Sequence, residues 1–141
     1  MERRSFNTCA AGIIIGSSLP LYGKQDRIRI GQIGLGHPHA SGKLNAIQSL
    51  PETYDLVGVV EPDLSLRKRA KGVTFLSLDQ LMNVKGLQAV AIETQVKDLV
   101  NTALPVVEAG KHIHLDKPAG PTLAPFEKLL ESAKRQGVPV Q

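Results

Sequence analysis

Residues 27–40 read Arg-Ile-Arg-Ile-Gly-Gln-Ile-Gly-Leu-Gly-His-Pro-His-Ala, and this stretch decides the fold. An apolar run leads into Gly34-Leu35-Gly36, and from residue 40 apolar side chains recur at helical spacing. This order predicts a strand, a tight glycine turn and a helix, the unit that binds a dinucleotide pyrophosphate. Gly34 lets the chain turn sharply, and Gly36 lets the backbone approach phosphate oxygens beside the helix N-terminus.

One position departs from the G-x-G-x-x-G pattern of such loops. The third glycine would fall at position 39, where this chain has a histidine. We expect His37 to line the pyrophosphate turn, and His39 to begin the helix and hold it slightly off the strand. The glycine motif alone is weak evidence, so the residues downstream carry weight.

Apolar strands and helical segments alternate along the rest of the chain. Further strands are predicted at 55–60, 73–76, 87–92, 111–115 and 138–141, separated by helical segments at 64–71, 78–83, 96–109 and 123–136. Pro105 lies inside one helix and predicts a kink or a late start, and Thr122 is the expected cap of the last. The alternation implies right-handed crossovers, and therefore an α/β fold: a three-layer Rossmann-type parallel sheet with helices on both faces.

An acidic residue follows the second predicted strand, in Glu61-Pro62-Asp63. A carboxylate there can accept hydrogen bonds from adenosine ribose hydroxyls, although an acid before a proline can also be a plain turn residue. Because a carboxylate repels a 2′-phosphate, we expect NAD rather than NADP. Arg67 and Lys68 lie close enough in sequence to leave NADP open.

Composition narrows the class of protein. With 141 residues, 42% of them hydrophobic, the chain can form one compact domain with its own core. The net charge is +4, but aromatic residues make up 4%, which argues against a nucleic-acid surface of basic and stacking side chains. The single cysteine, Cys9, excludes an intrachain disulfide and a cysteine zinc cluster.

Residues 1–23 are predicted to be a targeting segment, followed by the Rossmann domain at 24–141. Arg3-Arg4-Ser5-Phe6-Asn7 resembles a twin-arginine export signal. The apolar stretch after it is too short to span a bilayer, so no stable membrane span is expected. We expect export to the periplasm or another extracytoplasmic space. The alternative is an ordinary basic N-terminus on a cytoplasmic protein.

Residues 108–118, Glu-Ala-Gly-Lys-His-Ile-His-Leu-Asp-Lys-Pro, carry the most specific motif of the chain. They resemble the Glu-Ala-Gly-Lys-His…Glu-Lys-Pro signature of the Gfo/Idh/MocA oxidoreductases. Together with the glycine loop and Glu61-Pro62-Asp63, the resemblance covers about 24–141. It implies an NAD(P)-binding domain and hydride transfer between nicotinamide and a sugar or polyol.

The resemblance also implies roles for individual residues. Lys117 is similar to the lysine that lies beside the nicotinamide ring and the reacting sugar hydroxyl, so it is the expected catalytic residue. Asp116 replaces the usual glutamate. Thr94 corresponds to the threonine of a Thr-Pro element that lines the cofactor, and Gln95 stands in for its proline. The expected cofactor site is therefore Gly34, Leu35, Gly36, His37, Glu61, Thr94, Gln95, Asp116 and Lys117.

The family resemblance extends beyond what this chain contains. In that family a second α/β domain supplies the substrate site and an aspartate–histidine pair, so this chain is either a fragment or a shortened, non-catalytic nucleotide-binding module. A methyltransferase that uses S-adenosylmethionine is a third hypothesis, and the Lys117-Pro118 element argues against it.

Two histidine pairs invite a metal site, His37-Pro38-His39 and His112-Ile113-His114. No carboxylate or cysteine accompanies either pair at ligand spacing in the sequence, and relatives in the family use no metal for hydride transfer. We therefore expect no metal.

Overall fold

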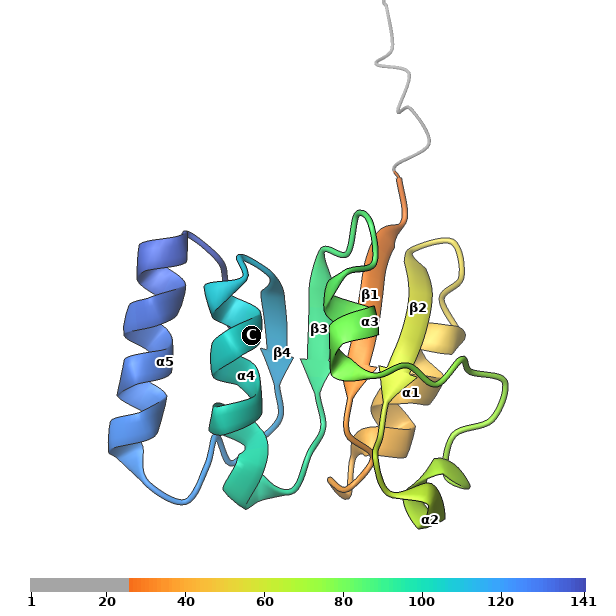
Figure 1. The fold of residues 1–141 in the computed structure, drawn as a ribbon, viewed down its shortest axis with the longest axis horizontal. Coiled ribbons are helices and arrows are strands. Elements are labelled where there is room, and N and C mark those ends of the chain that lie inside the picture. Colours follow the sequence, from red (N-terminus) through yellow and green to blue (C-terminus); the bar gives the residue numbers. More distant parts are fainter. Residues whose placement is uncertain (1–25) are drawn as a thin grey trace, which may run out of the picture.

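A parallel sheet in the strand order β2-β1-β3-β4 forms the centre of the computed structural model, which describes residues 26–141 (Figure 1). The strands are β1 Ile28–Ile33, β2 Tyr54–Val60, β3 Ala89–Ile92 and β4 His112–Leu115. The predicted parallel Rossmann-type sheet is confirmed. The predicted leader at 1–23 lies outside the described residues.

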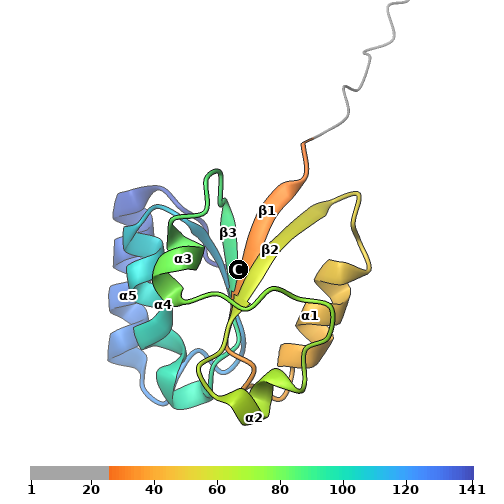
Figure 2. The ribbon, with the colours of Figure 1, turned by 45° about the vertical axis from the view of Figure 1, so that its right-hand side comes forward.

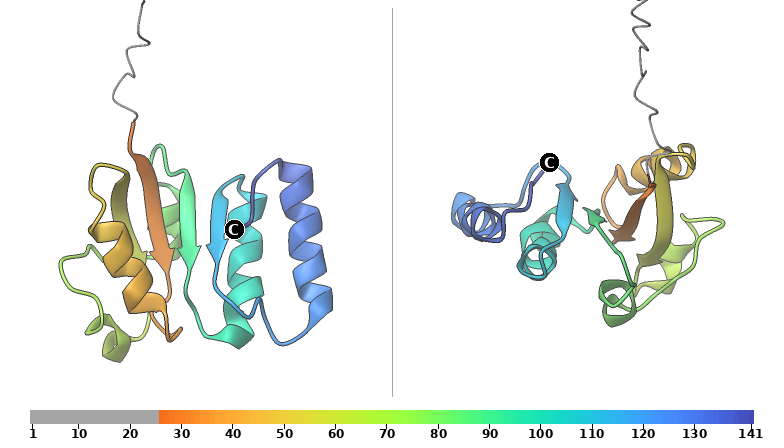
Figure 3. Two further views of the ribbon diagram at one scale, coloured as in Figure 1. Left: turned by 180° about the vertical axis from the view of Figure 1, so that it is seen from behind. Right: turned by 90° about the horizontal axis from the view of Figure 1, so that it is seen from above.

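Helices lie on both faces of the sheet, as predicted. They are α1 Ala40–Gln48, α2 Leu64–Arg67, α3 Leu78–Met82, α4 Leu99–Glu108 and α5 Leu123–Gln136, with a 3₁₀ turn, η1 Val96–Asp98, before α4. α1 covers one face, and α3 and α4 cover the other, with α5 beside α4 (Figure 2 and Figure 3). The helix that contains Pro105 makes the late start expected of it, because its α-helical part begins only at Leu99.

β3 is buried on both faces, and its alternate side chains join two different cores. Val90 and Ile92 point into the larger core with α4 and α5. Ala91 packs with Ile30 and Ile47 on the α1 side. This explains why β3 reads as an uninterrupted apolar run.

Two of the predicted strands are reduced to single bridges. Segment 73–76 pairs with β2 only through Phe75 and Val59, because Ser77 already begins α3. Segment 138–141 pairs with β4 only through Val140 and Ile113, and Pro139 within it has no N–H to donate.

Several boundaries also differ from the prediction. β3 begins at Ala89 rather than at residue 87, because Leu87 donates its N–H to Val84 in a turn. β2 begins one residue earlier than expected, at Tyr54, and α2 ends early, at Arg67. Thr122 occupies the N-cap of α5, but its side chain makes no capping hydrogen bond.

Coverage of the α1 face is uneven. α1 crosses β1 and β2, whereas no described helix crosses β3 and β4 on that side (Figure 3). An apolar groove of about 410 Å³ lies there, and its lining includes Ile28, Ile30, Ile47, Ala89, Ala91 and Ile113. Among residues 26–141, no helix is both long enough and apolar enough to cross a membrane.

Candidate functional site

The glycine loop lies at the carboxyl edge of the sheet, between β1 and α1. Gly34 has a φ of +92°, and a Cβ built on it would lie 2.6 Å from the Thr94 nitrogen. A Cβ on Gly36 would lie 3.1 Å from Gln95 Cγ. Thr94 and Gln95, predicted from the sequence as cofactor-lining residues, therefore lie directly against the loop. Glycine is required at position 34, where the backbone of two segments meets.

Glu61 ties the glycine loop to the end of β2. It is 5% exposed, and its carboxylate accepts the Leu35 N–H at 2.7 Å and the Asp63 N–H at 2.9 Å. On the same loop, Arg69 Nη1 donates to the Leu35 carbonyl at 3.1 Å. Each carboxylate oxygen keeps a second lone pair, so the predicted ribose contact is compatible with this bracing role.

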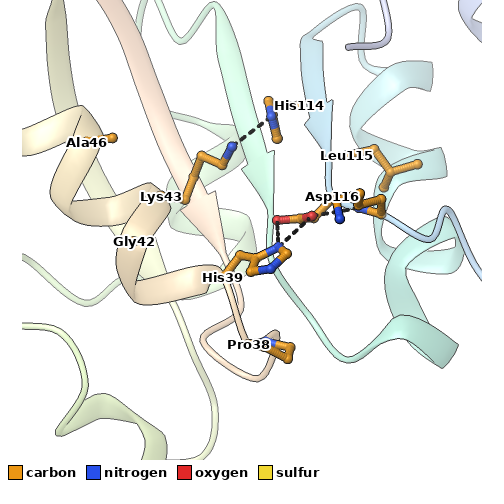
Figure 4. Close-up of a pocket in the computed structure, with 9 residues that line it drawn as sticks. Pro38, His39, Gly42, Lys43, Ala46, His114, Leu115 and Asp116 are labelled. Atoms are coloured by element: carbon orange, nitrogen blue, oxygen red, sulfur yellow. Dashed lines mark hydrogen bonds and ion pairs between the residues drawn. The ribbon is translucent and has the colours of Figure 1, made fainter.

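Asp116 and Lys117 follow β4 at the same edge (Figure 4). Asp116 is 6% exposed; Lys117 donates its backbone N–H to the carboxylate at 2.7 Å, and His39 Nδ1 lies 3.1 Å from it. Although burial alone would raise the pKa of Asp116, the hydrogen bonds from His39 and the Lys117 amide lower it to about 2. Lys117 is exposed, and its peptide bond to Pro118 is cis.

His39 shows how the loop dispenses with its third glycine. It occupies the N-cap of α1, and its side chain is 53% exposed. The next residue, Ala40, is fully buried in the core on the α1 side. A small residue therefore faces the sheet one position later than the glycine pattern predicts, and the His39 ring points outward to Asp116.

Glu93 was missed by the motif reasoning. It follows β3 with a fully buried side chain, and neither carboxylate oxygen has a hydrogen-bond partner. His37 Nδ1 lies 3.8 Å from one oxygen, and His114 Nδ1 lies 3.9 Å from the other. Burial, followed by the negative charge of Asp116, raises the pKa of Glu93 to about 7. The available signal was its place directly after a strand buried on both faces.

A lysine–histidine pair, also missed, links α1 to β4. Lys43 Nζ donates to His114 Nε2 at 2.8 Å (Figure 4). Burial, and then the charge of Lys43, lower the pKa of His114, so the ring stays neutral and accepts this bond. The pair lines a cavity of about 680 Å³ together with His39, Asp116 and Lys117.

The edge therefore collects groups suited to a phosphorylated ligand. The glycine loop, the N-terminus of α1 and two lysines offer positive potential, while Glu61 and Asp116 offer carboxylate acceptors. In open α/β sheets, ligands bind at this edge where neighbouring crossovers leave in opposite directions. β1 and β3 meet that condition, because their helices α1 and α4 lie on opposite faces.

Residues 28–141 match the family model described as GFO_IDH_MocA, oxidoreductase family, NAD-binding Rossmann fold. No curated protein matches the chain.

Solved oxidoreductases share the fold. A putative oxidoreductase from Erwinia carotovora atroseptica is 26% identical with a TM-score of 0.72, covering 81% of this chain and 36% of its own. The WlbA dehydrogenase of Bordetella pertussis, solved with NADH and UDP-GlcNAcA, is 19% identical with a TM-score of 0.70, covering 82% and 36%. GenD2 of gentamicin A biosynthesis, solved with NAD, is 21% identical with a TM-score of 0.72, covering 84% and 34%. The chain thus spans about a third of the length of these structures.

Proposed function

Because this chain belongs to the Gfo/Idh/MocA oxidoreductase family, as a NAD-binding Rossmann domain, we propose that it holds NAD along its carboxyl edge for hydride transfer. The reaction would join the nicotinamide to a hydroxyl-bearing carbon of a sugar or polyol. One observation carries the proposal: the glycine loop is braced by Glu61 on one side and lies beside Asp116 on the other.

Each part of the edge has a role in this proposal. The backbone of the loop from Gly34 to His37 would bind the pyrophosphate, since its glycines leave room for phosphate oxygens. Glu61 would accept from the adenosine ribose with its remaining lone pairs. Thr94, Gln95 and Asp116 would line the nicotinamide half.

NAD is preferred over NADP in this proposal. A buried carboxylate at position 61 disfavours a 2′-phosphate. Arg67 is already engaged, since its Nε donates to the Glu61 carbonyl at 2.7 Å and its guanidinium lies 4.8 Å from the centre of the Phe75 ring. NADH should therefore bind more tightly than NADPH, and Glu61→Gln should narrow the difference.

The bound cofactor supplies the hydride chemistry. Lys117, exposed at the edge, would hold the substrate oxygen and stabilise the negative charge that develops on it. A sugar substrate agrees with the UDP-sugar bound to the Bordetella relative.

A second candidate function is a module that holds the dinucleotide without turnover. It is favoured because, within residues 26–141, Lys117 is the residue that the family resemblance places at the reacting atoms. Assaying the chain with NAD and a panel of polyols separates the two candidates, because binding without reduction of NAD supports the module.

Binding is tested by titrating the full chain with NADH and following nicotinamide fluorescence. We expect saturation with wild type and affinity at least about tenfold weaker, or about 1.4 kcal/mol, with Gly36→Val, whose side chain would enter the pyrophosphate turn. Gly36→Ala should fall between them. Circular dichroism checks that each variant is folded. Equal NADH affinity for wild type and folded Gly36→Val would rule out the loop assignment.

A further inference from the structure

A group of metal-ligand side chains lies at the carboxyl edge, in addition to the dinucleotide track. We propose that His37, His39 and Asp116 bind one divalent transition-metal ion, with Zn²⁺ as the best-suited ion. This goes beyond the proposed function, because none of the roles assigned there requires a metal.

The spacing of the three side chains fits a metal site. His39 Nδ1 lies 3.1 Å from one oxygen of Asp116, and His37 Nδ1 lies 3.5 Å from the other. One ligand atom from each of the three residues can be chosen so that all lie within 4.8 Å of one another. Two ligands of a tetrahedral zinc ion are separated by about 3.3 Å when each bond is about 2.0–2.1 Å. The group is therefore close to the geometry of a bound ion.

The fold, rather than the linear sequence, brings the third ligand. His37 and His39 lie on the loop between β1 and α1, while Asp116 follows β4. β3 alone separates β1 from β4 in the sheet, so both loops meet at one edge. In Figure 4 the His39 ring faces the Asp116 carboxylate. This supplies the carboxylate that the spacing of the histidine pair in the sequence lacks.

Glu93 is a second, independent observation at the same place. Its side chain is fully buried, and its carboxylate faces His37 Nδ1 at 3.8 Å with no hydrogen bond to either oxygen. An unpaired buried carboxylate is costly, and here a second carboxylate, Asp116, lies beside it. A divalent cation held by His37 and Asp116 would offset this negative charge. Glu93 would then be a fourth ligand or an acceptor behind His37.

The donor chemistry selects the class of metal. Two imidazoles and a carboxylate suit zinc and neighbouring divalent ions, whereas calcium and magnesium prefer oxygen ligands alone. Three protein ligands also leave a coordination position for water or a ligand oxygen. Because His39 and Asp116 line the cavity of about 680 Å³, that position would be reachable from outside.

Two existing contacts would change on binding. The His39 backbone N–H donates to His37 Nδ1 at 3.2 Å, and coordination through that nitrogen would replace this long hydrogen bond. The proton shared between His39 and Asp116 would be released to solvent. His114 is not a ligand in this proposal, because its Nε2 already accepts from Lys43.

The test is a titration of the untagged full chain with Co²⁺ alone, followed by visible absorption, and with Zn²⁺ alone, followed by calorimetry. We expect one ion per chain. His39→Ala and Asp116→Asn should each weaken affinity by at least about tenfold, the effect caused by loss of even an outer partner of a ligand. His39 is half exposed, so His39→Ala should fold, and circular dichroism checks this. His112→Ala is the matched control and should bind as wild type does.

Three results would overturn the proposal: no cobalt spectrum with the folded wild type, equal binding by His39→Ala and wild type, or loss of binding in Cys9→Ser, which would assign the ion to the thiol. NADH titration in EDTA is read separately. Metal binding without NADH binding would refute the proposed function alone, and the reverse would refute the metal site alone.

Discussion

Gly34 and Gly42 differ in what an added methyl group would meet. At Gly34 it would lie 2.6 Å from the Thr94 nitrogen, on backbone with a φ of +92°, whereas at Gly42 nothing lies within 4 Å. We expect Gly34→Ala to lower the free energy of unfolding by about 3 kcal/mol or more. Gly42→Ala, inside α1, should raise it by about 0.5–1 kcal/mol. Urea unfolding followed by circular dichroism measures both, and equal effects would contradict the close packing at position 34.

Glu93 should make stability depend on pH in the metal-free chain. The groups that face it are Asp116, Lys43, His37 and His114. Its pKa is about 7 in the folded chain against 4.5 ordinarily, so the folded state binds the proton more tightly. The free energy of unfolding should therefore fall as pH rises from 4.5 to 7, by about 3 kcal/mol at most, and then level off.

Comparison of wild type with Glu93→Gln isolates this contribution, because glutamine does not titrate. Urea unfolding in EDTA at several pH values between 4.5 and 8 is the measurement. The difference in unfolding free energy between the two proteins should change across this range. A difference that stays constant with pH would mean that the pKa of Glu93 is not raised. Asp116, with a lowered pKa, acts below pH 4 and does not interfere.

Residues in motifs could be predicted from the sequence, and residues outside motifs could not. Gly34 and Glu61 stand at spacings that a nucleotide loop requires, and the structure brings them together. Glu93 and Lys43 belong to no motif, and their environment arises only when β3, β4 and α1 meet. Their pairing is a property of tertiary contact, which one-dimensional spacing does not encode.

At the scale of the element, α3 and α5 offer a matched pair of helix caps. Ser77 forms a capping box with Gln80 at the start of α3, whereas the Thr122 side chain makes no capping bond to α5. Ser77→Ala should therefore lower the free energy of unfolding by about 1 kcal/mol, and Thr122→Ala should change it little. Urea unfolding compares the two variants. A larger loss from Thr122→Ala would contradict the assignment of the caps.

The helices and inner strands were predicted well, and the errors fall on short edge segments. Segments 73–76 and 138–141 have the apolar composition of strands, yet each is limited to a single bridge. Apolar composition favours burial, but strand pairing also depends on how far the neighbouring strand extends and on the residues that flank the segment. Ser77 and Pro139 decided these two cases.

At the scale of the whole molecule, alternation of strands and helices predicted the layers and the edge at which the site lies. The uneven cover of the α1 face was not predicted, because alternation does not specify which strands a helix crosses. α1 lies over β1 and β2, and the apolar groove over β3 results from that placement.

The contact between His39 and Asp116 joins residues 77 positions apart. Parallel pairing of β1, β3 and β4 must be complete before the two side chains meet, and closing such long loops is entropically costly and slow. The edge is therefore assembled late on the folding pathway and dissolves whenever any of these three strands opens. Occupancy by a ligand at this edge reports on the integrity of the entire sheet, so affinity and the kinetics of unfolding are coupled in this chain.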